Sequence, residues 1–314
     1  MGVSPSSRLG GDLPPLIKSR SEGAPMQTAR EMKRTTTLFS PGFSISSLPW
    51  WAIILMLTGL YLIYAILTTP NYHDTFIFLK AGVLTTLRIT LIAFPIATLI
   101  GLVVGLARMS KNVAIFTLAT LYIEVVRGIP LVVLILIIAF GIVPIFVEVV
   151  NGVGSWGLSL SSAGVLRSAF QGLETFNIRT ISLELRAIIA LALGYGAFEA
   201  EVFRAGIQSI GRGQMEAARS LGMSYFLAMR LIILPQAIRR ILPPLGNDFI
   251  ALLKDSSLAT VLAVNELTQL TRLRRSSTFR VMEAFNVAAF LYLSMTLLLS
   301  GVVRVLERRL KFVE

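Results

Sequence analysis

The chain has 314 residues, of which 54% are hydrophobic and only 15% are charged, whereas about a quarter of the residues in an ordinary soluble domain are charged. With a mean hydropathy of +0.75, this composition indicates a membrane protein. The chain has no cysteine and a single histidine, His73, which excludes disulfides, thiolate metal sites and multi-histidine clusters, so we expect no metal and no cofactor in it. The net charge of +12 does not predict nucleic-acid binding, because the basic residues lie between apolar runs, where positive charge commonly fixes membrane orientation.

Residues 1–48 are rich in Ser, Pro, Gly and Thr, and we expect them to form a disordered basic tail. After the tail come apolar stretches of roughly 20 residues, the length that crosses about 30 Å of hydrocarbon. Four of these stretches contain no charged residue: Trp50–Thr68, Ile89–Ala107, Ile129–Val147 and Ala284–Val303.

Two further apolar regions are interrupted by charged residues, which usually means that they line something polar. They are Leu185–Arg204, with Glu199 and Glu201 near its end, and Leu242–Asn265, with Asp248, Lys254 and Asp255 inside. The short run Val113–Ile123 cannot span alone, so we expect it to form one helix with Ile129–Ala139, bent around Gly128 and Pro130. The sequence thus predicts an all-α membrane protein with six transmembrane helices and a Gly- and Ser-rich loop outside the membrane at residues 148–184.

The distribution of basic residues predicts the orientation of these helices. With both termini in the cytoplasm, 18 Lys and Arg residues lie on the cytoplasmic side and 8 on the outer side, as the positive-inside rule requires. One cluster breaks the rule, because Arg272, Arg274, Arg275 and Arg280 fall on the outer side.

The segment GQMEAARSLGMSYFLAMRLIILP predicts a short helix on the cytoplasmic side, from Gln214 to Leu221, that ends at Gly222. Glu216 suits the positive end of the helix dipole. Ala217 and Ala218 offer a smooth face that another protein can approach closely. The alternative is an ordinary amphipathic connector, because short motifs match by chance.

This segment resembles the conserved cytoplasmic loop of the permease subunits of ATP-binding-cassette (ABC) importers, which has the same spacing of EAA, glycine and Ile-x-Leu-Pro. Further matches are similar to the polar amino acid permeases, the group that includes the histidine and glutamine permeases. They are TTLRIT (85–90), YIEVVRGIPLVV (122–133), GAFEAEVFRAGIQSI (196–210), PQAIRRILPPLGNDFIALLKDSSL (235–258), and NELTQL with STFR (265–280). The family has a similar basic stretch at the outer arginine cluster.

The resemblance implies a five-helix permease core at residues 81–314, with an ATPase-coupling region at 209–223 that contains Glu216, Ala217, Ala218 and Gly222. Three features depart from the family pattern. Residues 49–80 add an N-terminal transmembrane helix and a loop, the periplasmic loop at 148–184 is an insertion, and Gly211 stands where proline is more frequent.

The sequence has no GxxxxGK[ST] motif and so cannot cradle nucleotide phosphates as a P-loop does. The resemblance therefore implies separate ATPase subunits that bind the ATP. It also implies a second permease subunit, alike or different, a periplasmic substrate-binding protein, and a polar amino acid substrate. The expected location is the bacterial inner membrane, surrounded by lipid.

Three charged residues are candidates for the substrate path: Glu124, Arg127 and Glu199. Glu124 and Arg127 lie three residues apart on one helix face, where they can instead form a structural pair or reach the membrane interface. Glu199 lies beside Gly194 and Gly196, which either open the helix near a cavity or simply allow close packing. For Lys254 and Asp255 a salt bridge is the preferred interpretation.

Two other classes of protein fit the sequence less well. A self-contained, ion-coupled secondary transporter commonly carries an inverted repeat, of which the sequence shows no convincing sign, and has no use for the EAA segment. An intramembrane enzyme needs a nucleophile and a base, and the only histidine is expected in a loop. The sequence leaves open which amino acid is carried.

Overall fold

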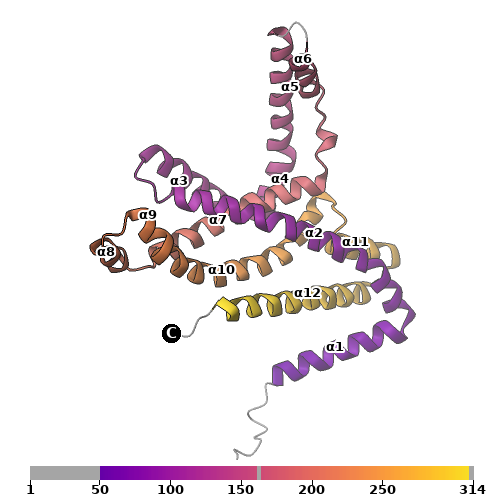
Figure 1. Cartoon of the computed structure of the whole chain (residues 1–314). Helices are drawn as coiled ribbons and strands as arrows, with labels where there is room; N and C mark the ends of the chain where they lie inside the picture. The colour runs from indigo at the N-terminus through magenta and orange to yellow at the C-terminus, as the bar shows by residue number, and fades with distance from the viewer. Residues whose placement is uncertain (1–49, 161–163, 311–314) are drawn as a thin grey trace, which may run out of the picture. The chain divides into compact units, whose positions relative to one another are not determined.

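The computed structural model describes residues 50–160 and 164–310, and within these ranges the regular secondary structure is entirely helical, with no strand (Figure 1). The tail predicted at residues 1–48 lies outside the described residues. In chain order the helices are α1 (Trp50–Thr68), α2 (Pro70–Ala107), α3 (Val113–Gly128), α4 (Leu131–Ile137), α5 (Val143–Leu160), α6 (Val165–Glu174), α7 (Leu183–Gln208), α8 (Arg212–Ser220), α9 (Tyr225–Ala228), α10 (Leu234–Asp255), α11 (Leu267–Thr278) and α12 (Val281–Leu310). Short π-helical turns join α4 to α5 and α9 to α10, and a 3₁₀ turn (η5, Ser256–Leu262) follows α10.

Four stretches of helix in the described ranges are long and apolar enough to cross a membrane: Trp50–Thr68, Pro70–Ala107, Leu131–Leu160 and Val281–Arg308. The first has the predicted bounds. The second begins about five turns before the predicted Ile89, because Pro70 suits the first helical turn and the polar residues after it continue the helix. His73, expected in a loop, therefore lies in the first turn of α2.

The single bent helix expected across Gly128 and Pro130 is wrong, because the structure has two separate helices there. α3 ends at Gly128, and Ile129 is extended with φ −104° and ψ 134°. A residue before proline is disfavoured in the helical region, and the proline lacks the N–H that a continuous helix needs. Pro130 instead precedes α4, and its carbonyl accepts a hydrogen bond from Leu134 N–H at 3.0 Å.

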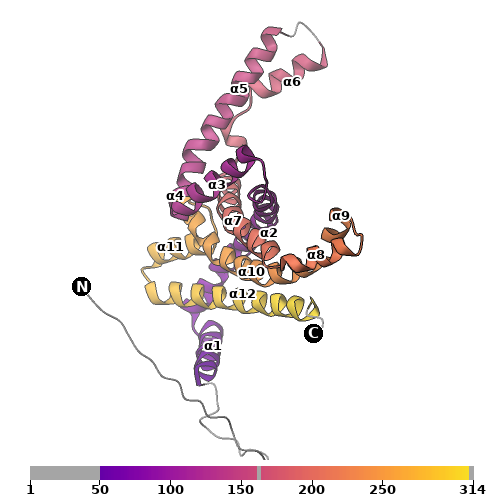
Figure 2. The ribbon, with the colours of Figure 1, turned by 90° about the vertical axis from the view of Figure 1, so that its left-hand side faces the viewer.

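The loop expected at residues 148–184 is also mostly wrong, because its described part is largely helical. α5 continues to Leu160 and packs against α6, as Figure 2 shows. Gly154 and Gly157 face α6 so closely that a Cβ at either position would collide with it. The glycines that suggested a loop are thus the residues that let two helices approach.

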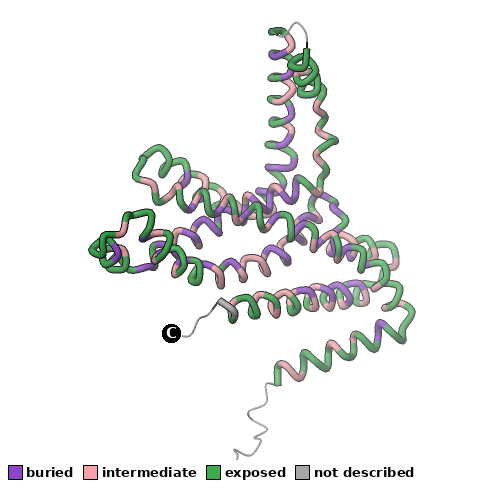
Figure 3. The backbone as a smooth tube through the Cα atoms, viewed as in Figure 1, coloured by how far each residue is buried: buried purple, intermediate pink, exposed green. Residues whose placement is uncertain are grey.

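The core lies where α2 packs along α7, the most extensive helix pair, and the buried residues follow this contact in Figure 3. A Cβ on Gly101 would lie 2.7 Å from Cβ of Glu199, and one on Gly105 would lie 2.7 Å from the Ala200 carbonyl oxygen. A Cβ on Gly196 would likewise lie 2.7 Å from Cγ2 of Ile100. These glycines therefore serve close packing, and α7 runs unbroken past Gly196.

The helix α10 separates two short helices, α8 and α11. Its 22 residues span about 33 Å, close to the thickness of the hydrocarbon core. α8 and α9 precede it and α11 follows it, so α8 and α11 lie at opposite ends of α10, as Figures 1 and 2 both show.

Candidate coupling and translocation site

The helix α8 confirms the short helix predicted before Gly222. It runs from Arg212 to Ser220, and Gly222 follows with φ +80°, a conformation that glycine adopts without strain. The N–H of Gly222 donates to the Arg219 carbonyl at 3.0 Å, and the N–H of Met223 donates to the Ala218 carbonyl at 3.2 Å. This pair of bonds is the Schellman motif that ends many helices, so Gly222 fixes the direction in which the chain leaves α8.

The four coupling candidates do not all lie on one face. Glu216 and Ala217 are exposed, whereas Ala218 is only 4% exposed. Ala218 is therefore turned toward the rest of the chain, as is the half-buried Met215 on the same helix, which packs against the buried cluster that includes Ile207 and Ile233. The expectation of one smooth face made by both alanines is therefore wrong: Ala218 anchors α8, and Ala217 remains accessible to a partner.

A charged network joins α2, α3 and α7 near the α8 end of α7. Arg108 forms ion pairs with Glu201 and, at 3.5 Å, with Glu124. Arg204 also binds Glu201, at 2.6 Å, and donates to Gln208 at 2.7 Å. Because each carboxylate and guanidinium has a partner of opposite charge, the network holds the three helices together.

The pair expected between Glu124 and Arg127 is not among the ion pairs of the described residues. Glu124 turns to Arg108, and the guanidinium of Arg127 lies 5.5 Å from the centre of the Phe198 ring. A cation over an aromatic face is stabilised by the ring quadrupole. Sequence reasoning did not select Arg108, Glu201 or Arg204 for the site, although the motif GAFEAEVFRAG contains the last two.

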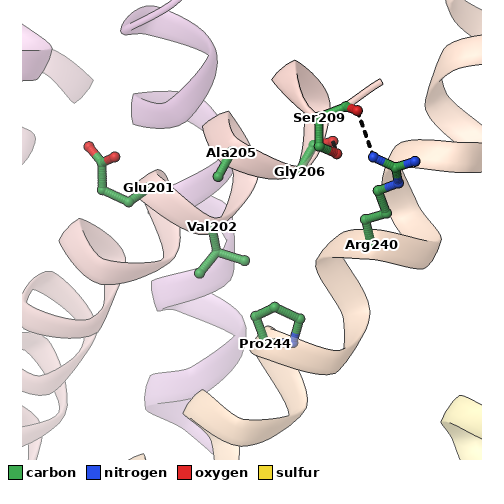
Figure 4. Close-up of a pocket in the computed structure, with 7 residues that line it drawn as sticks. All are labelled: Glu201, Val202, Ala205, Gly206, Ser209, Arg240 and Pro244. Atoms are coloured by element: carbon green, nitrogen blue, oxygen red, sulfur yellow. Dashed lines mark hydrogen bonds between the residues drawn. The ribbon is translucent and has the colours of Figure 1, made fainter. Parts of the chain in front are cut away.

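An open groove of about 460 Å³ lies between α7 and α10, just before the chain turns into α8 (Figure 4). Its walls are Glu201, Val202, Ala205, Gly206, Ser209, Arg240 and Pro244. Arg240 Nη1 donates to the Ser209 carbonyl at 2.6 Å across the groove. This bond ties the end of α7 to α10.

Glu199 is the most buried charged candidate, with 0% exposure in the middle of α7. In the described part of the chain neither of its carboxylate oxygens meets the geometry of a hydrogen bond, and the same holds for Thr98 Oγ1 and Asp248 Oδ2, although the Thr98 hydroxyl of α2 lies close enough to Glu199 to interact with it. Asp248 on α10 is near enough to Glu199 to interact with it electrostatically. Helices α2, α7 and α10 therefore bring unpartnered oxygens together in the core.

The salt bridge expected for Lys254 and Asp255, within the helix or between helices, is absent, because neither residue is in an ion pair of residues 50–160 and 164–310. Asp255 instead accepts a hydrogen bond from the Tyr195 hydroxyl at 2.7 Å, while Lys254 is exposed. Asp255 thus links α10 to α7 and has a structural partner.

Residues 97–312 match the family model described as "binding-protein-dependent transport system inner membrane component". The chain belongs to this family. The matched range contains every coupling and path candidate, and it leaves out α1 and the first part of α2.

The chain is similar to named members of such transport systems. It is 36% identical to a nopaline transport system permease protein of Agrobacterium fabrum, over 74% of this chain and 88% of that one. It is 34% identical to the glutamine transport system permease protein of Escherichia coli, over 73% of this chain and 91% of that one.

The chain is also similar to chains of solved transporter structures. A chain of an amino acid ABC transporter crystallised with histidines is 37% identical, with a TM-score of 0.59, covering 78% of this chain and 98% of that chain. A chain of the inward-facing MetNI methionine ABC transporter has a TM-score of 0.55 at 19% identity, covering 75% and 97% of the two chains, and shows the shared fold.

Proposed function

We propose that this family member is the permease subunit of an ABC importer that moves polar amino acids across the bacterial inner membrane. The observation that carries the proposal is α8, a short helix fixed by Ala218 and Gly222, with Ala217 exposed, inside the range matched by the family model. Relatives named for nopaline and glutamine, and a related transporter crystallised with histidines, support the substrate class.

Four kinds of partner belong to the proposal. The sequence contains no P-loop motif, so separate ATPase subunits bind ATP and dock on α8. A second permease subunit completes the translocation path between the two. A periplasmic substrate-binding protein delivers the amino acid, and lipid surrounds the exposed apolar helices. We propose no cofactor in this chain itself.

The translocation path, we propose, passes at least one of Glu124, Arg127 and Glu199. A free amino acid carries an ammonium and a carboxylate, and both need polar partners inside the membrane. The structure favours Glu199, because its buried oxygens have no hydrogen-bond partner among the described residues. Glu124 and Arg127 are exposed and already contact Arg108 and Phe198.

Reconstitution tests the proposed function. The purified permease in liposomes with its ATPase partners and binding protein should take up polar amino acids only when ATP is supplied. A partner ATPase with its P-loop lysine replaced by alanine is the control and should abolish uptake. Uptake by the permease alone, driven by an ion gradient, would show a secondary transporter and overturn the proposal.

Six crossings with both termini in the cytoplasm are also proposed. Five of the crossings are the single helices α1, α2, α7, α10 and α12. The sixth is a broken crossing made by α3 together with α4 and α5. This arrangement places α8 in the cytoplasm and the α5–α6 turn outside.

A reporter experiment checks this orientation. An alkaline phosphatase inserted next to Gly164 should be active, because it folds only outside the cytoplasm, and the same enzyme fused after Glu314 should be inactive. A fluorescent protein that matures only in the cytoplasm should give the opposite pattern. Phosphatase activity at the C-terminus would mean that one crossing has been miscounted.

A further inference from the structure

The arginines that break the positive-inside rule gather on and just after α11. Between Leu267 and Met282 the chain has four arginines and no acidic residue. None of the ion pairs within the described ranges includes any of them. Arg272, Arg275 and Arg280 are exposed, and we refer to these three as the outer arginine face. The two helices packed against α11 also carry charged residues, among them Asp74 and Lys80 on α2 and Glu283 on α12.

The helix that carries this face is held firmly. Glu266 is fully buried, and its two carboxylate oxygens accept the backbone N–H groups of Thr268 and Gln269 at 2.7 Å each, capping α11. The Tyr292 hydroxyl of α12 donates to the same carboxylate at 3.0 Å. The N–H of Leu267 donates to Thr86 Oγ1 of α2 at 3.2 Å. The outer arginine face therefore has a fixed position relative to α2 and α12.

One arginine of the cluster is turned inward and serves this attachment. Arg274 Nε donates to Thr75 Oγ1 at 3.3 Å, and its guanidinium lies 5.8 Å from the centre of the Phe78 ring. Arg272 Nη1 makes a 3.3 Å bond to Thr260 Oγ1 and leaves its other donors open. Arg275 and Arg280 are exposed, and among the described residues their guanidinium groups take part in no ion pair and no side-chain hydrogen bond.

Large apolar side chains lie among these arginines. Phe279 is 86% exposed at the turn between α11 and α12, Met282 is 70% exposed, and Leu273 and Val281 are exposed as well. This turn leads directly into the membrane-spanning stretch that begins at Val281. Alternating basic and large apolar side chains are typical of the boundary between lipid headgroups and acyl chains. The exposed Phe279 and Met282 lie next to the start of this membrane-spanning stretch, where lipid acyl chains can cover them.

We propose that the outer arginine face binds the headgroups of anionic phospholipids, with the acyl chains lying against Phe279 and Met282. A phosphate accepts two parallel hydrogen bonds from the planar guanidinium fork. The negative charge of the lipid also balances the positive charge of these arginines, which the positive-inside rule disfavours on the outer side. The assignment to the outer leaflet rests on the proposed orientation, whereas the binding itself does not.

Fluorescence quenching tests the site in the purified full-length permease chain, so that no tryptophan of a partner subunit contributes to the signal. Trp50, Trp51 and Trp156 are replaced by Phe, and Phe279→Trp supplies a reporter at the turn. The protein is placed in phosphatidylcholine vesicles that contain brominated phosphatidylglycerol or, in parallel, brominated phosphatidylcholine. We expect the phosphatidylglycerol to quench at a concentration about fivefold lower or better, since each nearby arginine contributes about that factor.

Charge variants assign the preference to named residues. Arg275→Gln with Arg280→Gln should bring the ratio of the two quenching concentrations close to one, and the matched pair Arg275→Lys with Arg280→Lys should retain it. Each single Gln variant provides the test if the double variant does not assemble. Equal quenching by both lipids in the parent protein would refute the proposal, as would an unchanged ratio in the Gln variants. An unchanged ratio combined with loss of ATPase stimulation by the binding protein would identify a protein-docking face instead. These readouts need no transport activity, so a failure of the proposed import function would leave this result interpretable.

Discussion

Ala217→Arg should lower ATP-driven uptake about tenfold or more, because an enlarged side chain in a close-packed contact commonly costs about 1–3 kcal/mol. Ala217 is exposed on α8 in the isolated chain, so the substitution leaves the fold of the permease intact. The loss arises only when an ATPase docks. Uptake and ATP hydrolysis in proteoliposomes measure the effect, and size-exclusion chromatography measures assembly.

Two matched controls separate docking from folding. Ala217→Ser keeps a small exposed side chain and should transport normally. Ala218→Arg places a charge at a position only 4% exposed and should reduce the amount of folded permease. Normal transport by Ala217→Arg with the cognate ATPase would rule out α8 as the coupling element.

Substitutions at Gly222 test the coupling role of α8 in a different way, because they act only on the backbone conformation that ends the helix. Nothing lies within 4 Å of a Cβ built on Gly222, but its φ is +80°. A β-branched residue in the left-handed region costs about 1–2 kcal/mol, whereas asparagine tolerates it. Gly222→Val should therefore impair coupling more than Gly222→Asn, although in neither variant would the Cβ come within 4 Å of a neighbouring residue.

Glu199→Gln should lower uptake about tenfold or more while the permease still assembles. The substitution preserves the shape of the side chain, so the contact with Gly101 survives. It replaces a carboxyl group, which can bind a substrate ammonium group as a carboxylate, by an amide that cannot ionise, and a hydrogen bond to a charged group is worth about 1.5–3 kcal/mol. Uptake of basic, acidic and neutral amino acids should be measured, with the largest loss expected for substrates that carry an extra positive charge.

Glu124→Gln and Arg127→Gln are the companion variants. The Glu124 side chain is 68% exposed, and its ion pair with Arg108 is 3.5 Å long; such pairs contribute at most about 1 kcal/mol. Both variants should therefore change uptake less than Glu199→Gln does. Wild-type rates and an unchanged substrate ranking in all three variants would mean that hydroxyls, amides and backbone groups build the path. Loss of expression in the Glu199 variant would instead favour a structural role.

Several features follow from local sequence alone. The span Trp50–Thr68 needs only a run of apolar residues as long as the membrane is thick. The helix before Gly222 needs only good helix formers and a residue that accepts positive φ. The EAA spacing and the motifs at residues 196–210 and 235–258 indicated the family that the comparisons show. The close packing at Gly101 and Gly105 can also be predicted from the sequence, since small residues four positions apart lie on one helix face.

Other features depend on contacts between segments far apart in the sequence. Glycine and serine in residues 148–184 suggest a loop to any local argument, but Gly154 and Gly157 lie against a second helix and let it approach. The ion pairing of Glu124 differs from the sequence-based interpretation for the same reason. Glu124 has Arg127 three residues away on its own helix, yet the fold brings Arg108 to it instead. Sequence spacing shows which charges can meet on one helix and says nothing of those on neighbouring helices.

The sequence by itself determined that this chain is a helical membrane protein with an EAA segment, because hydrophobic length and motif spacing are local properties of the chain. Only the tertiary structure decided that Ala217 is exposed while Ala218 is buried, and that Glu199 meets Gly101 with its oxygens unpartnered. Burial and pairing are decided by which helix faces which, and that depends on side-chain packing along the whole of α2, α7 and α10.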